Sequence, residues 1–318
     1  MLLTLSAALA GTMYVHVLDV GQGDSILIET PDGATILIDA ATGGAGVAKQ
    51  LDRLGVEELD LVITSHPHAD HMGGMRQVVV QYPIELYVDS GLEHTTKTYK
   101  ALMGALDQYE VDHRRAVQGE TFEFDDDIVL TVLWPGTSYL RDTRSDLNSN
   151  SVVVRLDHKN DCFLFTGDAE EPTEHGLMSA GLEQCDVLKV AHHGSNHSST
   201  TSFLRAVDPD IALISLGEGN RYGHPGDETI KRLQSQDIVI YRTDDSGHLT
   251  VASTGRTIEV VDGLPWTDGR GPTERDPEDT GPPTVADTGE SPNLSGVRGT
   301  PPPMDTSTTR RGCLLFRR

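Results

Sequence analysis

From Met13 to Asp262 the chain alternates short runs of β-branched and apolar residues with longer segments whose apolar residues recur at helical spacing. The short runs predict strands at 14–18, 25–29, 35–38, 61–64, 85–88, 128–133, 151–156, 162–166, 186–191, 211–215, 238–241 and 248–252. The longer segments predict helices at 45–54, 95–108, 171–180, 201–206 and 228–234. Strands interleaved with helices in this way predict a layered α/β domain over residues 13–262.

The pattern stops after Asp262. Residues 263–318 hold nine of the 16 prolines and eight of the 32 glycines, with almost no periodic apolar residues. This composition predicts a disordered tail. Its basic and apolar end, residues 310–318, would suit a membrane surface or a partner groove, although a tail without a role explains it equally simply.

Residues 1–12 form the other terminal segment. Leu2 to Ala10 is a short apolar run ending in Ala8-Leu9-Ala10, which resembles the apolar core and cleavage site of a secretory signal. No basic residues precede it, so a signal remnant and a frayed terminus are both open. The first alternative implies an exported or cell-surface protein and the second a cytoplasmic one. No apolar run approaches the ~18 residues that span a membrane, so no stable membrane insertion is expected. The oligomeric state is open.

Composition adds a large negative charge. The 318 residues carry a formal net charge of −24, and only six of the 25 basic residues are lysines. A strongly acidic, lysine-poor surface is typical of a salt-adapted, halophilic protein, because carboxylates keep a protein soluble when salt screens other charges. The alternative is an acidic protein that is not adapted to concentrated salt. The spacing of Cys162, Cys185 and Cys313 matches no zinc or disulfide framework, and we assign these cysteines no chemistry.

The strongest chemical signal is His66-Pro67-His68-Ala69-Asp70-His71, directly after the apolar run 61–64. In a loop that leaves a strand, His66 and His68 can point to one metal ion, while Asp70 and His71 reach a second one. Imidazole and carboxylate groups are ligands for Zn²⁺, Mn²⁺ or Fe²⁺. This spacing therefore predicts metal binding.

Two distant segments supply further ligands. Asp168 follows shortly after the apolar run 162–166, and His192-His193 directly follows the run 186–191. Alone, the aspartate is typical of a turn and the histidine pair of an exposed surface. Together with the first motif, they predict a binuclear centre in which Asp168 bridges two cations.

These motifs resemble those of metallo-β-lactamase-fold hydrolases, and most closely those of the hydrolase domain of ComEC competence proteins. The matching segments follow one another in the order found in that family: Leu18-Asp19-Val20-Gly21-Gln22-Gly23-Asp24-Ser25, Leu37-Ile38-Asp39-Ala40, His66 to His71, Asn148-Ser149-Asn150-Ser151, Thr166-Gly167-Asp168, Leu188 to Ser195, and Tyr222-Gly223-His224-Pro225. The channel of transmembrane helices that ComEC-type proteins carry has no counterpart here, so we expect a free-standing hydrolase.

The resemblance implies a four-layer αββα sandwich with two divalent metal ions, zinc or manganese, at one edge between the sheets. His66 and His68 would bind one metal, Asp70 and His71 the other, and Asp168 would bridge them. His193 is expected as the final ligand and His192 behind it, because alternation along a strand lets only one of them face the metals. Asp39 would orient the histidine loop by hydrogen bonding. Asp24 is placed beside it in this supporting role, with a tight turn around Gly21-Gln22-Gly23 as the alternative.

One departure from the family bears on the substrate. Lactamases and glyoxalases supply a third histidine to the first metal from a Gly-His segment, and no such segment lies between His71 and Asp168. His94, His113 and His158 have the wrong neighbours, and Asn148 to Ser151 takes that place in the chain. The first metal is therefore expected to keep a position open for water or a substrate oxygen, which weakens the case for a β-lactamase.

The expected reaction is attack by a metal-bridging hydroxide that Asp168 orients. His224, Ser195 and Asn148 would hold nonbridging oxygens or protonate the leaving group. The resemblance favours a phosphodiester substrate, including single-stranded DNA. The net charge and the 5% aromatic content favour the alternative, a small-molecule hydrolase acting on a lactone, lactam or thioester. Concentrated salt would reduce the repulsion between this acidic chain and DNA.

Overall fold

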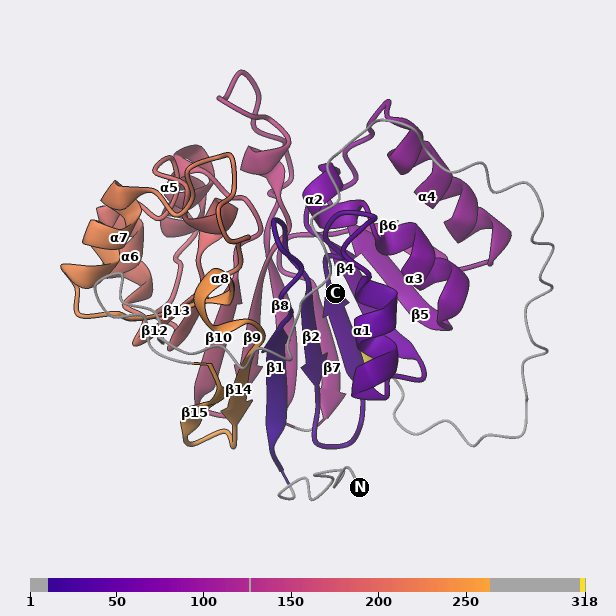
Figure 1. Cartoon of the computed structure of the whole chain (residues 1–318), viewed down its shortest axis with the longest axis horizontal. Coiled ribbons are helices and arrows are strands. Elements are labelled where there is room, and N and C mark those ends of the chain that lie inside the picture. The colour runs from indigo at the N-terminus through magenta and orange to yellow at the C-terminus, as the bar shows by residue number, and fades with distance from the viewer. Residues whose placement is uncertain (1–10, 126, 264–314, 318) are drawn as a thin grey trace.

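The computed structural model describes residues 11–125, 127–263 and 315–317, which form two eight-stranded sheets (Figure 1). The first sheet has the order β15 (Ile258–Asp262), β14 (Leu249–Ser253), β1 (Met13–Val17), β2 (Ile26–Glu29), β3 (Thr35–Ile38), β4 (Leu59–Thr64), β5 (Ile84–Asp89) and β6 (Asp112–Arg115). The second has the order β13 (Val239–Arg242), β12 (Ile211–Ile214), β11 (Val187–Lys189), β10 (Asp161–Phe165), β9 (Val153–His158), β8 (Ile128–Trp134), β7 (Thr121–Asp125) and β16 (Leu315–Arg317).

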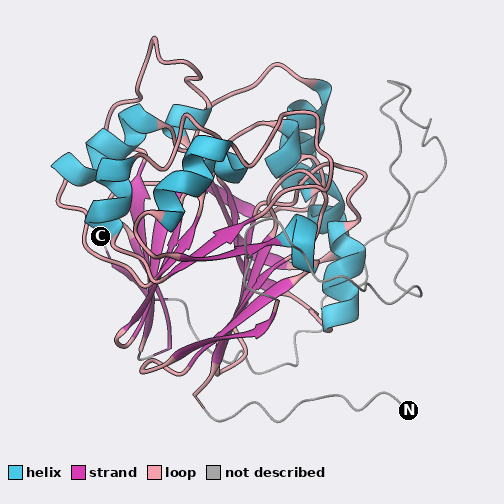
Figure 2. Cartoon of the chain, turned by 60° about the vertical axis from the view of Figure 1, so that its left-hand side comes forward, coloured by secondary structure: helices cyan, strands magenta, loops and turns pink. Residues whose placement is uncertain are grey.

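Helices cover the outer faces of both sheets, and Figure 2 shows the strands between them. The helices α1 (Val47–Leu54), α3 (Met75–Gln81) and α4 (Lys97–Gln108) share an apolar core with the first sheet. The second sheet packs in the same way against α5 (Glu171–Ser179), α6 (Thr201–Val207) and α7 (Asp227–Gln234). A third core, which includes Phe122, Phe163 and Phe165, lies between the sheets. The predicted αββα sandwich is confirmed.

The burial of each strand follows its place in this sandwich. All five residues of β10 are buried, as expected of a central strand covered on both faces, and its sequence is apolar almost throughout. In β8, nearer the edge, buried and half-buried residues alternate strictly, because its outer face has less cover. The β2–β3 hairpin turns at Pro31-Asp32-Gly33, where the φ of 92° at Gly33 favours glycine.

Parallel pairing brings the carboxyl ends of several strands to one edge of the molecule. The strands β3 to β6 are parallel neighbours in the first sheet, and β10 to β13 are parallel neighbours in the second. Their carboxyl ends carry the short helix α2 (Ala69–Met72) and the 3₁₀ turn η2 (Ala191–Gly194). The 3₁₀ turn η1 (Asn148–Asn150) lies at the same edge, because it directly precedes β9, which is antiparallel to β10. Ligands in α/β proteins bind at this edge.

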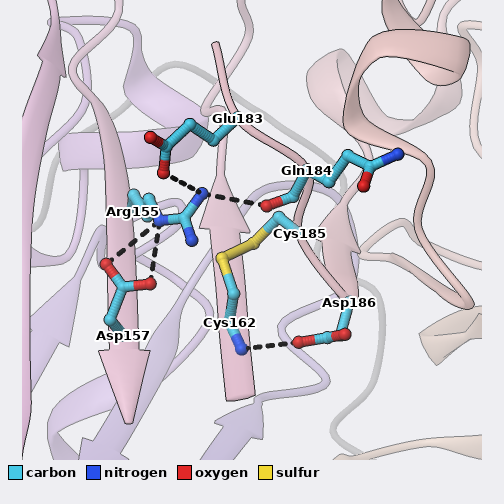
Figure 3. Close-up of a disulfide and its surroundings, with 7 residues drawn as sticks. All are labelled: Arg155, Asp157, Cys162, Glu183, Gln184, Cys185 and Asp186. Carbon is cyan, nitrogen blue, oxygen red and sulfur yellow. Dashed lines mark hydrogen bonds and ion pairs between the residues drawn. A yellow bond between two sulfur atoms is a disulfide. The ribbon is translucent and has the colours of Figure 1, made fainter. Parts of the chain in front are cut away.

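A disulfide between Cys162 and Cys185 joins β10 to the residues just before β11 (Figure 3), with a Cα–Cα distance of 5.0 Å. The prediction that these cysteines have no chemistry was wrong, because a separation of 23 residues does not reveal that they meet across two parallel strands. Cys313 lies outside the described residues. Figure 3 also shows Arg155 beside the disulfide, where it donates to Asp157 and to the backbone oxygen of Gln184.

The terminal segments are only partly covered by the structure. Residues 1–10, where a signal remnant was considered, and residues 264–314 and 318 of the expected disordered tail lie outside the described residues. Within the tail, residues 315–317 form β16, which pairs antiparallel with β7 and was not predicted. None of the helices in the described ranges is both long and apolar enough to cross a membrane.

Candidate metal centre

The histidine motif leaves the first sheet at the end of β4. His66 and His71 are fully buried, His68 is partly buried, and the side chain of Asp70 is 29% exposed. Gly23 explains how the neighbouring loop fits, because a Cβ there would lie 2.3 Å from the backbone oxygen of Asp70. Gly23, the last residue of the Gly21-Gln22-Gly23 turn, therefore lets the β1–β2 loop pack directly on the histidine motif.

Asp39 holds this loop from behind. Its carboxylate accepts hydrogen bonds from the backbone N–H and the Oγ of Ser65, both at 2.7 Å, and lies 2.8 Å from His71 Nδ1. The other ring nitrogen of His71 thus faces away from Asp39. This is the geometry expected of the orienting role predicted for Asp39.

Asp168 reaches the same point from the second sheet. Its Oδ1 lies 3.2 Å from His71 Nε2 and 3.7 Å from His193 Nε2. Its Oδ2 lies 3.8 Å from His66 Nε2 and 3.6 Å from His192 Nε2. The two carboxylate oxygens therefore face two different pairs of histidines, an arrangement suited to a bridge between two ions.

The end of β10 can approach β4 because residue 167 is glycine. Gly167 has a φ of 49°, and a Cβ there would lie 2.8 Å from the Cβ of Ser65. Ser151 completes the contact, since its Oγ accepts from the Asp168 backbone N–H at 3.2 Å and lies 3.3 Å from His66 Nδ1.

The histidine pair corrects one step of the sequence argument. β11 ends at Lys189, and His192 and His193 lie in η2 with φ values of 52° and 53°. Alternation along a strand therefore does not apply to them, and both rings approach Asp168. His193 is the more buried of the two, and its Nε2 lies 3.6 Å from Asp70 Oδ2. His192 contacts Glu170, with 3.5 Å between His192 Nδ1 and Glu170 Oε1.

Asp24 belongs to a buried network behind His193. Its Oδ1 lies 3.3 Å from His193 Nδ1, and its Oδ2 accepts from Lys189 Nζ at 2.6 Å. His193 Nδ1 also lies 3.0 Å from the backbone oxygen of Ser215. Sequence reasoning missed Lys189 and Ser215; the signal for Lys189 was a lysine inside an otherwise apolar strand.

Three buried polar atoms of the cluster, which lack hydrogen-bond partners in the described part of the chain, show whether it fits a metal ion. His71 Nε2, Asp168 Oδ1 and His193 Nε2 have no hydrogen-bond partner among the described residues, although buried polar atoms are normally paired. Each lies within 3.7 Å of at least one of the others. Asp70 belongs to the same group, since its ligand atoms and those of His71 and His193 lie within 4.8 Å of one another. The donor types and their unpaired state fit a divalent cation.

The buried carboxylates and histidines of the cluster shift each other's pKa values. Burial alone would raise the pKa of Asp168, but the charges of His71, His193 and His192 hold that pKa well below its usual range. Burial would lower the pKa of His71, whereas the Asp168 and Asp39 carboxylates raise it well above the ordinary value. The histidines and carboxylates of this centre therefore stabilise each other's charged forms.

The predicted catalytic residues lie at different places around this cluster. The Nδ2 of Asn148 lies 3.5 Å from the ring nitrogens of His192. The ring centre of His224 lies 5.6 Å from that of His192, and burial followed by the charges of His192 and His193 lowers the pKa of His224 to about 4. Ser195 is buried, and its Oγ accepts from the backbone N–H of His197, so this hydroxyl serves the local turn.

The three histidines set aside in the sequence analysis each have a different environment. The ring of His94 lies 3.0 Å from the hydroxyl of Thr96, that of His113 lies 3.2 Å from the Asp89 carboxylate, and that of His158 lies 2.7 Å from the hydroxyl of Ser253. Instead, Ser151 lies next to His66 and Asn148 next to His192, as the family-like order of motifs implied.

Comparison with known proteins shows which family this chain belongs to. Residues 18–218 match the family model described as the metallo-beta-lactamase superfamily. Competence protein ComA of Neisseria gonorrhoeae is 33% identical over 245 residues, which cover 74% of this chain and 31% of ComA. ComE operon protein 3 of Bacillus subtilis (strain 168) is 28% identical over 267 residues, covering 77% of this chain and 34% of that protein.

A shorter relative matches over most of its own length. Exodeoxyribonuclease WalJ of Streptococcus pneumoniae serotype 2 is 24% identical over 231 residues, covering 65% of this chain and 81% of WalJ. The chain spans only about a third of the length of the two competence relatives. The family match extends over more than half of the residues and contains every segment of the metal cluster: the chain belongs to the metallo-β-lactamase superfamily of metal-dependent hydrolases, with a domain like that of the ComEC-type competence proteins.

Proposed function

We propose that this chain is a binuclear metal-dependent phosphodiesterase that cleaves nucleic acid. The observation that carries the proposal is the position of Asp168, whose two oxygens face separate histidine groups from both sheets. The name of WalJ, an exodeoxyribonuclease, supports a nucleic-acid substrate.

His66, His68, Asp70, His71, Asp168 and His193 would hold two divalent ions, zinc or manganese. Such a pair, when bound, activates water and stabilises the charge that develops on a transferred phosphoryl group. Asp39 and Asp24 keep His71 and His193 in place through the contacts described above.

The remaining residues would act on the substrate itself. The lowered pKa of His224 keeps its imidazole neutral near pH 7, so its ring N–H can donate to a nonbridging oxygen. The amide of Asn148 offers a second donor beside His192. Ser195 stays a prediction: its Oγ accepts from the His197 backbone N–H, and its O–H would be the group that donates to the substrate.

A small-molecule hydrolase acting on a lactone, lactam or thioester is the second candidate. The observation that favours it is the net charge of −24, which repels a polyanion at ordinary ionic strength.

One experiment separates the two candidates. The full chain, loaded with Mn²⁺ or Zn²⁺ in concentrated potassium chloride, is incubated with single-stranded DNA, a cyclic dinucleotide, bis(p-nitrophenyl) phosphate, a lactone and a lactam. We expect cleavage of the phosphodiesters. Cleavage of only the lactone or the lactam would overturn the proposal.

Variants connect the activity to the cluster. We expect His68→Ala and Asp168→Ala to abolish phosphodiester hydrolysis and to lower the metal content, measured by elemental analysis after dialysis. His175→Ala is the matched control, because His175 is exposed on α5. Full turnover by Asp168→Ala would exclude the proposed centre.

A further inference from the structure

The loop between β8 and η1 brings charged side chains beside the metal cluster. It projects at the top of Figure 1, beyond the ends of the strands. The side chain of Asn150 fixes its base, accepting from the Leu140 backbone N–H at 2.9 Å and donating to the backbone oxygens of Leu140 and Asp146. Asp146 accepts from the N–H and Oγ of Thr143, which closes a tight turn around Arg144. Arg144 is thus carried by an ordered turn.

Arg144 is connected to the cluster through two side chains. Its Nε donates to Glu170 Oε1 at 3.2 Å, and the same oxygen lies 3.5 Å from His192 Nδ1. His192 Nε2 lies 3.6 Å from Asp168 Oδ2. The guanidinium is therefore connected to the proposed bridging carboxylate through Glu170 and His192.

The contact with Glu170 leaves most of the guanidinium available. The Glu170 side chain is 2% exposed and that of Arg144 is 52% exposed. Among the described residues, only Nε of this guanidinium has a hydrogen-bond partner. The two terminal nitrogens form a planar fork of donors, whose geometry suits a phosphate.

Two more arginines lie near the other end of the loop, Arg141 within it and Arg115 on β6. Tyr139 donates from its hydroxyl to the backbone oxygen of Ser90 at 2.7 Å, next to β5. The guanidinium of Arg115 lies 4.2 Å from the centre of the Tyr139 ring, and that of Arg141 lies 5.6 Å from it. The loop also carries an exposed carboxylate, Asp142. Aromatic rings and guanidinium groups together are typical of surfaces that bind single-stranded nucleic acid.

We propose that Arg144 binds a substrate phosphate next to the one that is cleaved, so that the site prefers a strand with successive phosphates to an isolated diester. This inference rests on the proposed phosphodiesterase function and deepens it. A neutral lactone offers a guanidinium no comparable partner, so the position of Arg144 also bears on the choice between the two candidate functions.

The test compares two substrates with the full-length Arg144→Gln variant. One is thymidylyl-thymidine, which has a single diester, and the other is a longer thymidine strand. We expect kcat/KM for the strand to fall about tenfold or more, as for the loss of one charge-assisted hydrogen bond, and kcat/KM for the single diester to stay within about twofold. Equal losses on both substrates, or no loss on either, would overturn the inference.

Binding supplies a readout that does not depend on turnover. The affinity for a fluorescent thymidine strand with phosphorothioate linkages is measured by anisotropy over a range of salt concentrations. Removal of one phosphate contact should reduce the slope of log K against log salt by about 0.7. The control is Arg205→Gln, an exposed arginine of α6, which should leave the slope and both rates unchanged. An unchanged slope in Arg144→Gln would contradict the proposed contact.

A purely structural role of Arg144 predicts a different result. If Arg144 only neutralises the buried Glu170, then Glu170→Gln should restore strand cleavage when combined with Arg144→Gln. The proposed phosphate contact predicts no such rescue. If the wild-type chain cleaves neither diester, the proposed function fails, while the salt dependence of binding still decides whether Arg144 contacts the strand.

Discussion

Lys189 shows how much one buried side chain contributes to the order of the centre. It is 1% exposed, and it donates both to Asp24 and to the backbone oxygen of Val190. Burial alone would raise the pKa of Asp24, but the Lys189 ammonium and His193 hold it below its ordinary value. Asp24 therefore stays ionised and can position His193. Removal of the lysine would leave a buried carboxylate without its partner.

We expect Lys189→Met to lower the free energy of unfolding by about 3–5 kcal/mol, the usual cost of breaking a buried ion pair from one side. Urea unfolding followed by tryptophan fluorescence measures this change. Lys231→Met is the matched control, because Lys231 and Glu228 form an exposed pair on α7 and its loss should leave the urea midpoint unchanged. Equal midpoints for Lys189→Met and the wild type would contradict the role of this ion pair.

At the scale of residues, the sequence revealed the side chains that stand in a recognisable spacing. The run from His66 to His71, together with Asp168 and His193, was found in this way. The structure gathers five of these residues into groups that could hold a metal ion: His66, Asp70, His71, Asp168 and His193. His68 lies beside them, with 2.9 Å between its Nδ1 and His66 Nε2. Glu170, Arg144 and Ser215 carry no such spacing, because each acts through a partner far away in the sequence. Their roles depend on tertiary contacts that a linear pattern does not contain.

At the scale of elements, the disulfide connects the two strands that lead to Asp168 and to the His192-His193 turn. Both cysteines are buried, at the end of β10 and β11 opposite to the metal cluster. A cross-link of this kind stabilises a protein mainly by restricting the unfolded chain. It persists in an oxidising compartment, so its presence in the native protein would distinguish export from a cytoplasmic location.

We expect the double replacement Cys162→Ala and Cys185→Ala to lower the free energy of unfolding by about 3 kcal/mol, given a closed loop of this length. Thermal unfolding with and without dithiothreitol measures the effect. The reductant should destabilise the wild type and leave the double variant unchanged. A wild-type melting temperature that is insensitive to a strong reductant under unfolding conditions would show that the bond does not form.

Most of the elements that the sequence predicted have a clear apolar period, but α3, β7 and β15 were missed. Strand β3 has its expected bounds, and helix α4 begins two residues later than expected. All five predicted helices are present. β6 was missed because its sequence, Asp-His-Arg-Arg, is entirely polar, as an edge strand allows. The short helices α2 and α8 (Thr243–Ser246) were missed because four residues are too few to show a helical period.

At the scale of the whole molecule, the net charge of −24 creates repulsion that opposes the compact state. The described residues include few buried ion pairs that could offset it, and several of the ion pairs are exposed, such as Lys159 with Asp127 and Lys231 with Glu228. Salt screens repulsion between exposed charges over about 10 Å at 0.1 M and about 3 Å at 1 M. The stability of this chain should therefore depend on salt.

We expect the melting temperature to rise by at least about 3 °C between low and molar potassium chloride, the shift produced by roughly one kcal/mol in a domain of this size. Differential scanning calorimetry of the full chain measures it. The variant Glu57→Gln/Glu58→Gln, which removes two exposed carboxylates, should show a smaller rise. A melting temperature that falls with potassium chloride would contradict the salt-adapted interpretation.

The pairing of β1 with β14 has a consequence for how the protein is made. Met13 lies opposite Ser253, and Val17 opposite Leu249, so the first strand finds one of its two neighbours near the end of the folded domain. During synthesis on the ribosome, one side of β1 must wait, unpaired, until nearly the whole domain has emerged. An open strand edge invites pairing with other chains. A nascent chain with this topology is therefore exposed to pairing with other chains until the first sheet closes.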